Sequence, residues 1–132
     1  MAGTFKFELV TPERMVVSEE ATQVVVPGTE GAFTVLPGHA PVISSLRPGV
    51  IDATLGDGRN LRAFVKGGFA EVDADRLIVL AERALNVDKM DASTVSQELE
   101  AAEAEFSGAA EDHKRMAAAH AIEELKSLQG LV

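Results

Sequence analysis

The sequence predicts an antiparallel β-sandwich of about ten short strands over residues 1–86, followed by an antiparallel hairpin of two helices over residues 87–132. Three observations lead to this prediction. Apolar residues in the first part alternate or form short β-branched runs, turn residues separate these runs at short intervals, and the apolar spacing changes to a helical period after Asn86. Many short strands at such intervals are typical of sandwiches and flattened barrels.

The first expected strand lies near the start of the chain. Phe5, Phe7 and Leu9 alternate with their neighbours, which places all three side chains on one face of the strand. A later run, residues 24–26, consists of valine alone and ends at a Pro-Gly pair. Aromatic residues make up only 5% of the chain, with no Trp and no Tyr, so the core is expected to be built mainly from aliphatic side chains.

Turn residues mark the ends of the expected strands. Residues 56–60 contain an Asp-Gly pair, which is a strong hairpin signal because glycine accepts the positive φ of a tight turn. Residues 73–76 form a second turn of polar residues between two apolar runs. The pair Gly67-Gly68 falls within the expected sheet and predicts either a bulge or a close approach of two backbones.

After Asn86 the sequence becomes rich in Ala and Glu. The first expected helix has an apolar stripe at helical spacing, formed by Val95, Leu99, Ala102 and Phe106. Asp91 is well placed as its N-cap, and Gly108 as its end. A second helix over residues 111–128 has a similar stripe, formed by Ala118, Ala121, Ile122, Leu125 and Leu128. The short linker requires antiparallel helices, and their narrow stripes indicate that the hairpin needs another surface to pack on.

Composition excludes several classes of function. The chain has no cysteine, which removes disulfides, thiolate nucleophiles and Cys-based metal sites. A net charge of −9 disfavours binding to nucleic acid or directly to an anionic membrane, and the last 45 residues hold ten acidic side chains against four basic ones. The first residues do not resemble a signal peptide, and no apolar run approaches the roughly 18 residues of a membrane span.

Histidine is the first residue type to consider for catalysis. His39 lies in a stiff loop, residues 36–41, with two prolines and a glycine. A triad of His39, Asp52 and Ser44 or Ser45 can be drawn, but neither serine lies in a nucleophile-elbow motif. We therefore predict no catalytic residue, and the residues favour a structural or interaction protein over an enzyme.

Metal and phosphate sites are equally poorly supported. His113 and His120 are seven residues apart, which is too far for the i, i+4 spacing of a shared metal, so they are interpreted as solvated or interhelical. Residues 28–31 have the two glycines of a phosphate loop, but they contain no lysine, open no helix and place Glu30 where the phosphate would lie. This segment is predicted to be a tight turn between strands, and no metal or cofactor is expected.

Residues 24–41, VVVPGTEGAFTVLPGHAP, resemble the epsilon subunit of bacterial and chloroplast F-type ATP synthases, which is equivalent to the mitochondrial delta subunit. The family has a valine-rich strand, a Gly-x-Glu-Gly turn and a Pro-Gly-His-Ala-Pro loop in this order. Residues 46–50, 65–72 and 77–82 continue the match. The resemblance is specific over most of residues 4–84 and extends with weaker motifs over the helices.

The resemblance implies a non-catalytic rotor subunit of the central stalk. The β-sandwich would bind the gamma subunit and rest on the ring of c subunits, coupling proton translocation to ATP synthesis. The protein would be peripheral, at the cytoplasmic face of the bacterial inner membrane, and associated with the membrane only through the complex. Contact of the hairpin with the catalytic alpha and beta subunits stays open, as do two alternatives: a role mainly as an inhibitor of ATP hydrolysis through the hairpin, and an unrelated small β-sandwich binding module.

The resemblance also names candidate contact residues. Glu30, Gly31 and His39 match family positions near the contact with the c ring and gamma, whereas the next position, often acidic in relatives, is Ala32. Relatives that bind ATP carry an Asp-x-x-Arg motif at the start of the first helix, and here only Asp91 of that motif is present. The resemblance therefore implies no ATP site, and the acidic hairpin implies weak self-inhibition.

Overall fold

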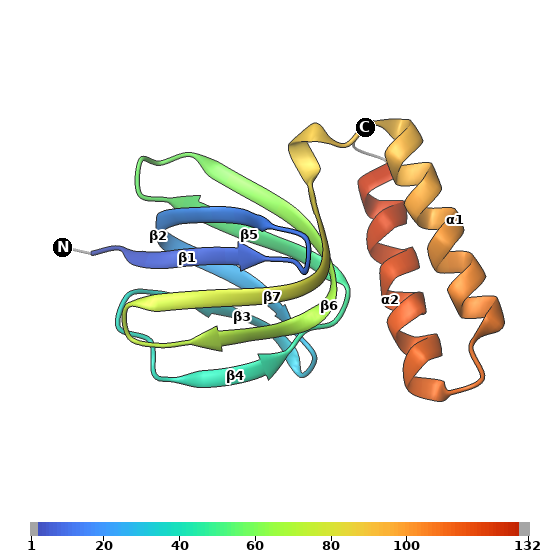
Figure 1. Ribbon diagram of the computed structural model, residues 1–132, viewed down its shortest axis with the longest axis horizontal. Coiled ribbons are helices and arrows are strands. Elements are labelled where there is room, and N and C mark those ends of the chain that lie inside the picture. Colours follow the sequence, from blue (N-terminus) through green and yellow to red (C-terminus); the bar gives the residue numbers. More distant parts are fainter. Residues whose placement is uncertain (1–2, 130–132) are drawn as a thin grey trace.

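The computed structural model describes residues 3–129, which form a β-domain of seven strands and a hairpin of two helices beside it (Figure 1). The strands are β1 (Phe5–Val10), β2 (Met15–Gly28), β3 (Gly31–Val35), β4 (Val42–Ser45), β5 (Gly49–Leu55), β6 (Asn60–Val72) and β7 (Arg76–Asn86). A 3-10 turn, Val87–Lys89, leads to α1 (Ala92–Gly108) and α2 (Asp112–Gln129). The predicted fold class is confirmed, although the expected number of about ten strands is wrong. Residues 1–2 and 130–132 of the two expected domains lie outside the described residues.

The structure has fewer strands than expected because three strands, β2, β6 and β7, are long. The strands follow the order β1-β7-β6-β5-β2-β3, with β4 paired to β6 and β1 also paired to β2. β6 pairs with β5 through residues 60–65 and with β4 through residues 69–72. β2 likewise pairs with β1 through its first half and with β5 and β3 through its second half. Segments that look like separate short strands in sequence are therefore halves of one strand that contributes to two parts of the sheet.

The pair Gly67-Gly68 permits a close approach of two backbones. Both residues have positive φ, +72° and +108°. Lys66 pairs with Arg83 and Gly68 with Ala81, so β6 and β7 stay in one register and no extra residue is inserted. A Cβ on Gly68 would lie 1.9 Å from the carbonyl oxygen of Leu80. Of the two predictions for this pair, close approach is confirmed and the bulge is wrong.

The buried apolar residues form two clusters. The first lies within the β-domain and includes Phe5, Phe7 and Leu9, with many Val and Ala side chains around them. The second lies between the β-domain and the hairpin, and is formed by Phe64, Val87, Met90, Val95, Ala102, Ala121, Leu125 and Leu128. The narrow apolar stripes of α1 and α2 thus pack on Phe64 and its neighbours. The β-domain is therefore the additional packing surface that the sequence predicted the hairpin to need.

Candidate partner-binding surfaces

Glu30 lies at the exposed tip of the turn between β2 and β3. Gly28 and Gly31 are paired, which leaves Thr29 and Glu30 as the two loop residues. Gly31 has a φ of +137°, and a Cβ on Gly28 would lie 2.7 Å from the Gly31 carbonyl oxygen. The predicted tight turn is confirmed, and it presents the Glu30 carboxylate to the outside.

The loop that contains His39 is held by backbone hydrogen bonds. The Gly38 N–H donates to the Ala74 carbonyl at 2.8 Å, and the His39 N–H donates to the Leu36 carbonyl at 3.1 Å. Nδ1 of His39 lies 2.6 Å from the Ala40 carbonyl oxygen; since that oxygen can only accept, Nδ1 carries the proton. The half-buried His39 ring is therefore oriented by its own loop.

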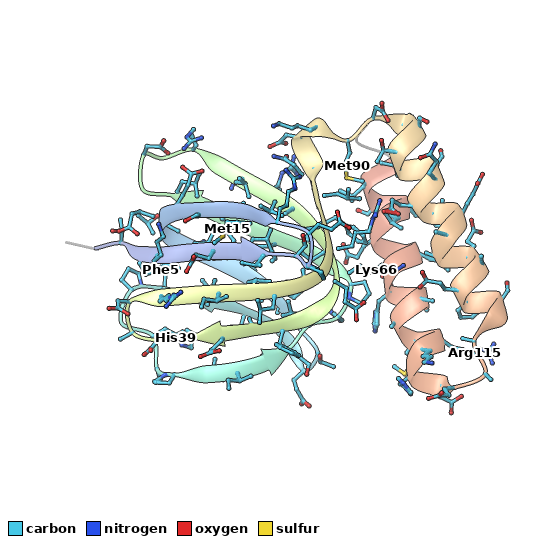
Figure 2. The ribbon with its side chains drawn as sticks, viewed as in Figure 1. Phe5, Met15, His39, Lys66, Met90 and Arg115 are labelled. Atoms are coloured by element: carbon cyan, nitrogen blue, oxygen red, sulfur yellow. The ribbon has the colours of Figure 1, made fainter. Side chains whose placement is uncertain are left out.

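The structure does not bring Glu30 and His39 together at one compact site. They flank β3, whose five residues span about 13 Å at the usual rise per residue. Thr29, next to Glu30, faces residues of α2, whereas His39 lies at the end of the β-domain remote from the helices (Figure 2). The two candidate residues mark two separate places on the surface.

No catalytic arrangement joins the residues of the imagined triad. Asp52 accepts a hydrogen bond from Asn60 at 2.6 Å, and the Ser44 hydroxyl donates to the Ser45 carbonyl at 3.0 Å. Within residues 3–129, no three His, Asp or Glu side chains are grouped as a metal ion would require. Over the same residues, neither helix has the length and apolar character needed to cross a membrane.

One outer face of the β-domain carries an exposed row of large apolar side chains, which the sequence reasoning missed. The row crosses four neighbouring strands and consists of Phe69, Leu80, Val10 and Met15. Each is paired directly with the next, so the side chains share one face of the sheet. Phe69, Leu80 and Met15 are 51%, 43% and 50% exposed. We call these four residues the apolar row.

The apolar row has apolar neighbours one step further along the strands. Ile43 on β4, 75% exposed, and Ile78 on β7 both pair with Glu71 of β6. Side chains alternate between the two faces of the sheet along residues 69–72. Ala70 and Val72 are buried, so Phe69 lies on the outer face. Residues 77–80 are all apolar, so alternation alone does not indicate which of them face outward.

Charged contacts also join the hairpin to the β-domain. Lys66 and Arg83, paired across β6 and β7, contact Glu105 and Glu98 of α1, and Figure 2 shows Lys66 reaching toward the helices. Apart from Glu98, these side chains remain 26–54% exposed. Exposed pairs of this kind contribute at most about 1 kcal/mol each, so the second apolar cluster provides most of the docking energy.

An interdomain groove of about 870 Å³ separates the β-domain from the loop end of the hairpin. The β-domain side includes Thr29, Leu46, Arg47, Pro48 and Lys66, and the helical side includes His113, Lys114, Met116, Ala117 and His120. His113 and His120 were interpreted from sequence as solvated or interhelical; His113 is indeed solvated, with its side chain 73% exposed, while His120 is half-buried, and both line the groove. His113 and His120 share one face of the helix with residues 116 and 117, because these four positions are three or four residues apart. This spacing is the signal in the sequence that the two histidines lie in a common environment.

Asp91 caps α1, as the sequence predicts. Its backbone is extended, with φ −106° and ψ 174°, and its Oδ1 accepts a hydrogen bond from the Thr94 N–H at 2.8 Å. This backbone hydrogen bond stabilises the ionised carboxylate and lowers the pKa of Asp91 below its usual range. The cap fully accounts for the position of this residue.

Replacing Asp91 by Ala is expected to lower the melting temperature of the hairpin by a few degrees, whereas Asp91→Asn keeps the cap and most of the stability. Because the folded-state pKa of Asp91 is depressed, the stabilisation is complete above the unfolded-state pKa of about 3.9 and is lost as pH falls through the lower folded value. Thermal unfolding followed by helical circular dichroism should show the Ala deficit shrinking below about pH 4. A deficit that stays constant from neutral pH to pH 3 would contradict capping by the carboxylate.

An apolar face left open on a small β-domain is typical of a subunit that binds other proteins. Comparison with known proteins agrees. Residues 4–87 match the family described as ATP synthase, Delta/Epsilon chain, beta-sandwich domain. The ATP synthase epsilon chain of Sinorhizobium medicae is 46% identical over 114 residues, covering 86% of this chain and 85% of that protein. That of Chelativorans sp. is 42% identical over 130 residues, covering 98% and 96%.

Solved structures share the fold at lower identity. A chain of the Euglena gracilis mitochondrial ATP synthase, in a structure of OSCP, F1 and the c-ring, superposes with a TM-score of 0.73 at 21% identity, covering 97% of this chain and 81% of that one. A chain from the central stalk and c-ring of the Tetrahymena thermophila enzyme gives a TM-score of 0.66 at 11% identity, covering 97% and 98%. The chain belongs to the ATP synthase epsilon chain family, whose members are non-catalytic subunits of the central stalk.

Proposed function

We propose that this subunit docks on the gamma subunit through the apolar row and rests on the ring of c subunits, so that rotation driven by proton translocation reaches the catalytic sites. The apolar row is the observation that supports this most directly, because large apolar side chains gathered on one face of a soluble domain usually mark a protein interface. A closely packed aliphatic core suits a part that must keep its shape under torque.

We further propose a division of labour along the chain. Residues 1–86 form the unit that binds gamma and the c ring, and residues 87–132 form a hairpin that can be positioned independently beyond the 3-10 turn. The complex holds the subunit at the cytoplasmic face of the bacterial inner membrane. Two features support this: β7 ends at Asn86, and the hairpin packs through a cluster separate from the β-domain core.

The candidate contacts Glu30, Gly31 and His39 are assigned to two places on the stalk. Glu30 is exposed on a turn that Gly31 shapes with its positive φ, which suits a charged contact with polar loops. His39 is fixed by its loop at the other end of β3, where its ring packs 6.5 Å from the ring of Phe33. Their separation favours one contact with the c ring and another at a neighbouring surface, rather than a single shared one.

The docking proposal is tested with the double variant Phe69→Glu, Leu80→Glu. Each glutamate would carry an unpaired charge into a desolvated interface, so affinity for purified gamma is expected to fall at least about 100-fold. Since both positions are about half exposed in the free subunit, its melting temperature should change little. Binding is measured by calorimetry, and coupling by ATP-driven proton pumping in reconstituted vesicles.

Met116→Glu is the control, because it places one of the same glutamate side chains at an exposed apolar residue of α2 outside the apolar row. It should leave the affinity for gamma unchanged. Full affinity of the double variant would show that docking uses another face. A wild-type subunit that does not bind gamma at all would contradict the proposed function itself.

A further inference from the structure

The groove beside α2 is an uncovered continuation of a packing surface. Residues 113, 116, 117 and 120 follow one another at helical spacing and line the groove. Further along α2, Ala121, Leu125 and Leu128 are buried in the second apolar cluster. The β-domain therefore covers the second half of α2 but stands away from its first half, where Met116 is 61% exposed.

The lining combines apolar surface with basic groups from both sides. Leu46, Pro48 and Met116 provide apolar side chains, while Arg47 of the β-domain and Lys114 of α2 provide cationic groups on opposite walls. Among the described residues Arg47 forms no ion pair, and Lys114 has only a 3.6 Å contact with Glu111 outside the groove. Cationic residues from both walls therefore line one groove of a chain whose net charge is −9.

The acidic side chains of the groove only partly offset these cations. Glu105 is already paired with Lys66, which leaves Glu82 beside Gly67 as the other carboxylate of the lining. The imidazole of His120 adds an N–H donor to the same wall, whereas Nε2 of His113 lies 3.4 Å from a carboxylate oxygen of Glu111. A volume of about 870 Å³ lies in the range of sites that bury most of a small organic ligand.

We propose that the interdomain groove binds a small amphipathic anion, with its apolar body against Leu46, Pro48 and Met116 and its carboxylate between Arg47 and Lys114. The ligand bridges the β-domain and α2, so its binding favours the docked position of the hairpin. The site is separate from Asp91, since α1 is about 25 Å long and the groove lies at its far end. It uses none of the residues assigned to gamma or c-ring contacts.

The three histidines allow a direct test on the isolated full-length subunit. Decanoate, kept below its micelle concentration, is titrated while the imidazole proton resonances are followed by NMR. Saturable shifts are expected for His113 and His120, which line the groove, and none for His39, which lies at the other end of the β-domain. Decanol, of equal length but without charge, should bind at least about tenfold more weakly, because its neutral hydroxyl forms no ion pair with Arg47 or Lys114.

Variants then assign the carboxylate position. Arg47→Gln and Lys114→Gln should each weaken decanoate binding about ten- to hundredfold, as expected for loss of one hydrogen bond to a charged group. Lys126→Gln, on α2 but outside the groove, is the matched control and should not change binding. Unchanged melting temperatures exclude misfolding as the cause.

Three results would overturn the proposal: no saturable shift of His113 or His120, equal shifts at His39, or equal affinity for decanol and decanoate. None of them bears on the docking of gamma, which is measured separately with a different face of the protein.

Discussion

Replacement of Gly68 by alanine is expected to destabilise the β-domain by about 3–5 kcal/mol, which is a large fraction of the stability of a small domain. The added Cβ would lie 1.9 Å from the carbonyl oxygen of Leu80 and 2.9 Å from the Cα of Ala81. Both are backbone atoms, so no side-chain rotation relieves the clash. Gly68 also has a φ of +108°, a conformation that an L side chain rarely adopts. Chemical denaturation followed by circular dichroism measures the loss.

Gly58→Ala separates the two causes. Gly58 also has a positive φ, +90°, but a Cβ there would meet no atom within 4 Å. Its replacement should cost only about 1–2 kcal/mol, the strain of the backbone alone. If the two variants lost equal stability, the clash with the backbone of β7 would add nothing to the strain of the positive φ.

The second large effect is expected for Leu125→Ala in the hairpin. Leu125 is 1% exposed and belongs to the cluster that packs α1 and α2 on Phe64. Removing it should destabilise the docked hairpin by about 2–4 kcal/mol through lost burial and the cavity left behind. Amide hydrogen exchange in α1 and α2 should then accelerate about thirty- to thousandfold where it occurs by undocking, while the β-domain core keeps its protection.

Met116→Ala is the control for this prediction, because Met116 lies on the same helix but is 61% exposed. It should alter stability by no more than about 0.5 kcal/mol. Equal acceleration throughout the β-domain in Leu125→Ala would show that the two apolar clusters unfold as one unit.

Features set by local chemistry could be predicted from the sequence. The turns at residues 28–31, 56–60 and 73–76 follow from residues that accept or favour turn conformations, and the structure has each of them. Asp91 was predicted as a cap because a short side chain before a helix can accept from a backbone N–H two or three residues on, and it does so.

Features set by long-range pairing could not be predicted in the same way. β6 continues through Gly67-Gly68, so two glycines inside one strand resembled the boundary between two strands. β2 continues through a register shift between Ala21 and Gln23, which no turn residue marks in the sequence. For this reason the sequence predicted about ten strands, whereas the structure has seven. The apolar row was hidden because its residues come from four strands, and the groove because its walls come from separate parts of the chain.

The pairing of β1 has a consequence for the order in which the protein forms. β1 lies between β2, which follows it directly, and β7, where Lys6 pairs with Arg76 and Val10 with Leu80. β1 therefore completes its hydrogen bonding only after its partner residues in β7, 70 positions further along the chain, have been made. Non-local closure of this kind slows folding, and until then one edge of β1 stays available to other chains. Early assembly in the cell thus depends on how quickly the seventh strand reaches the first.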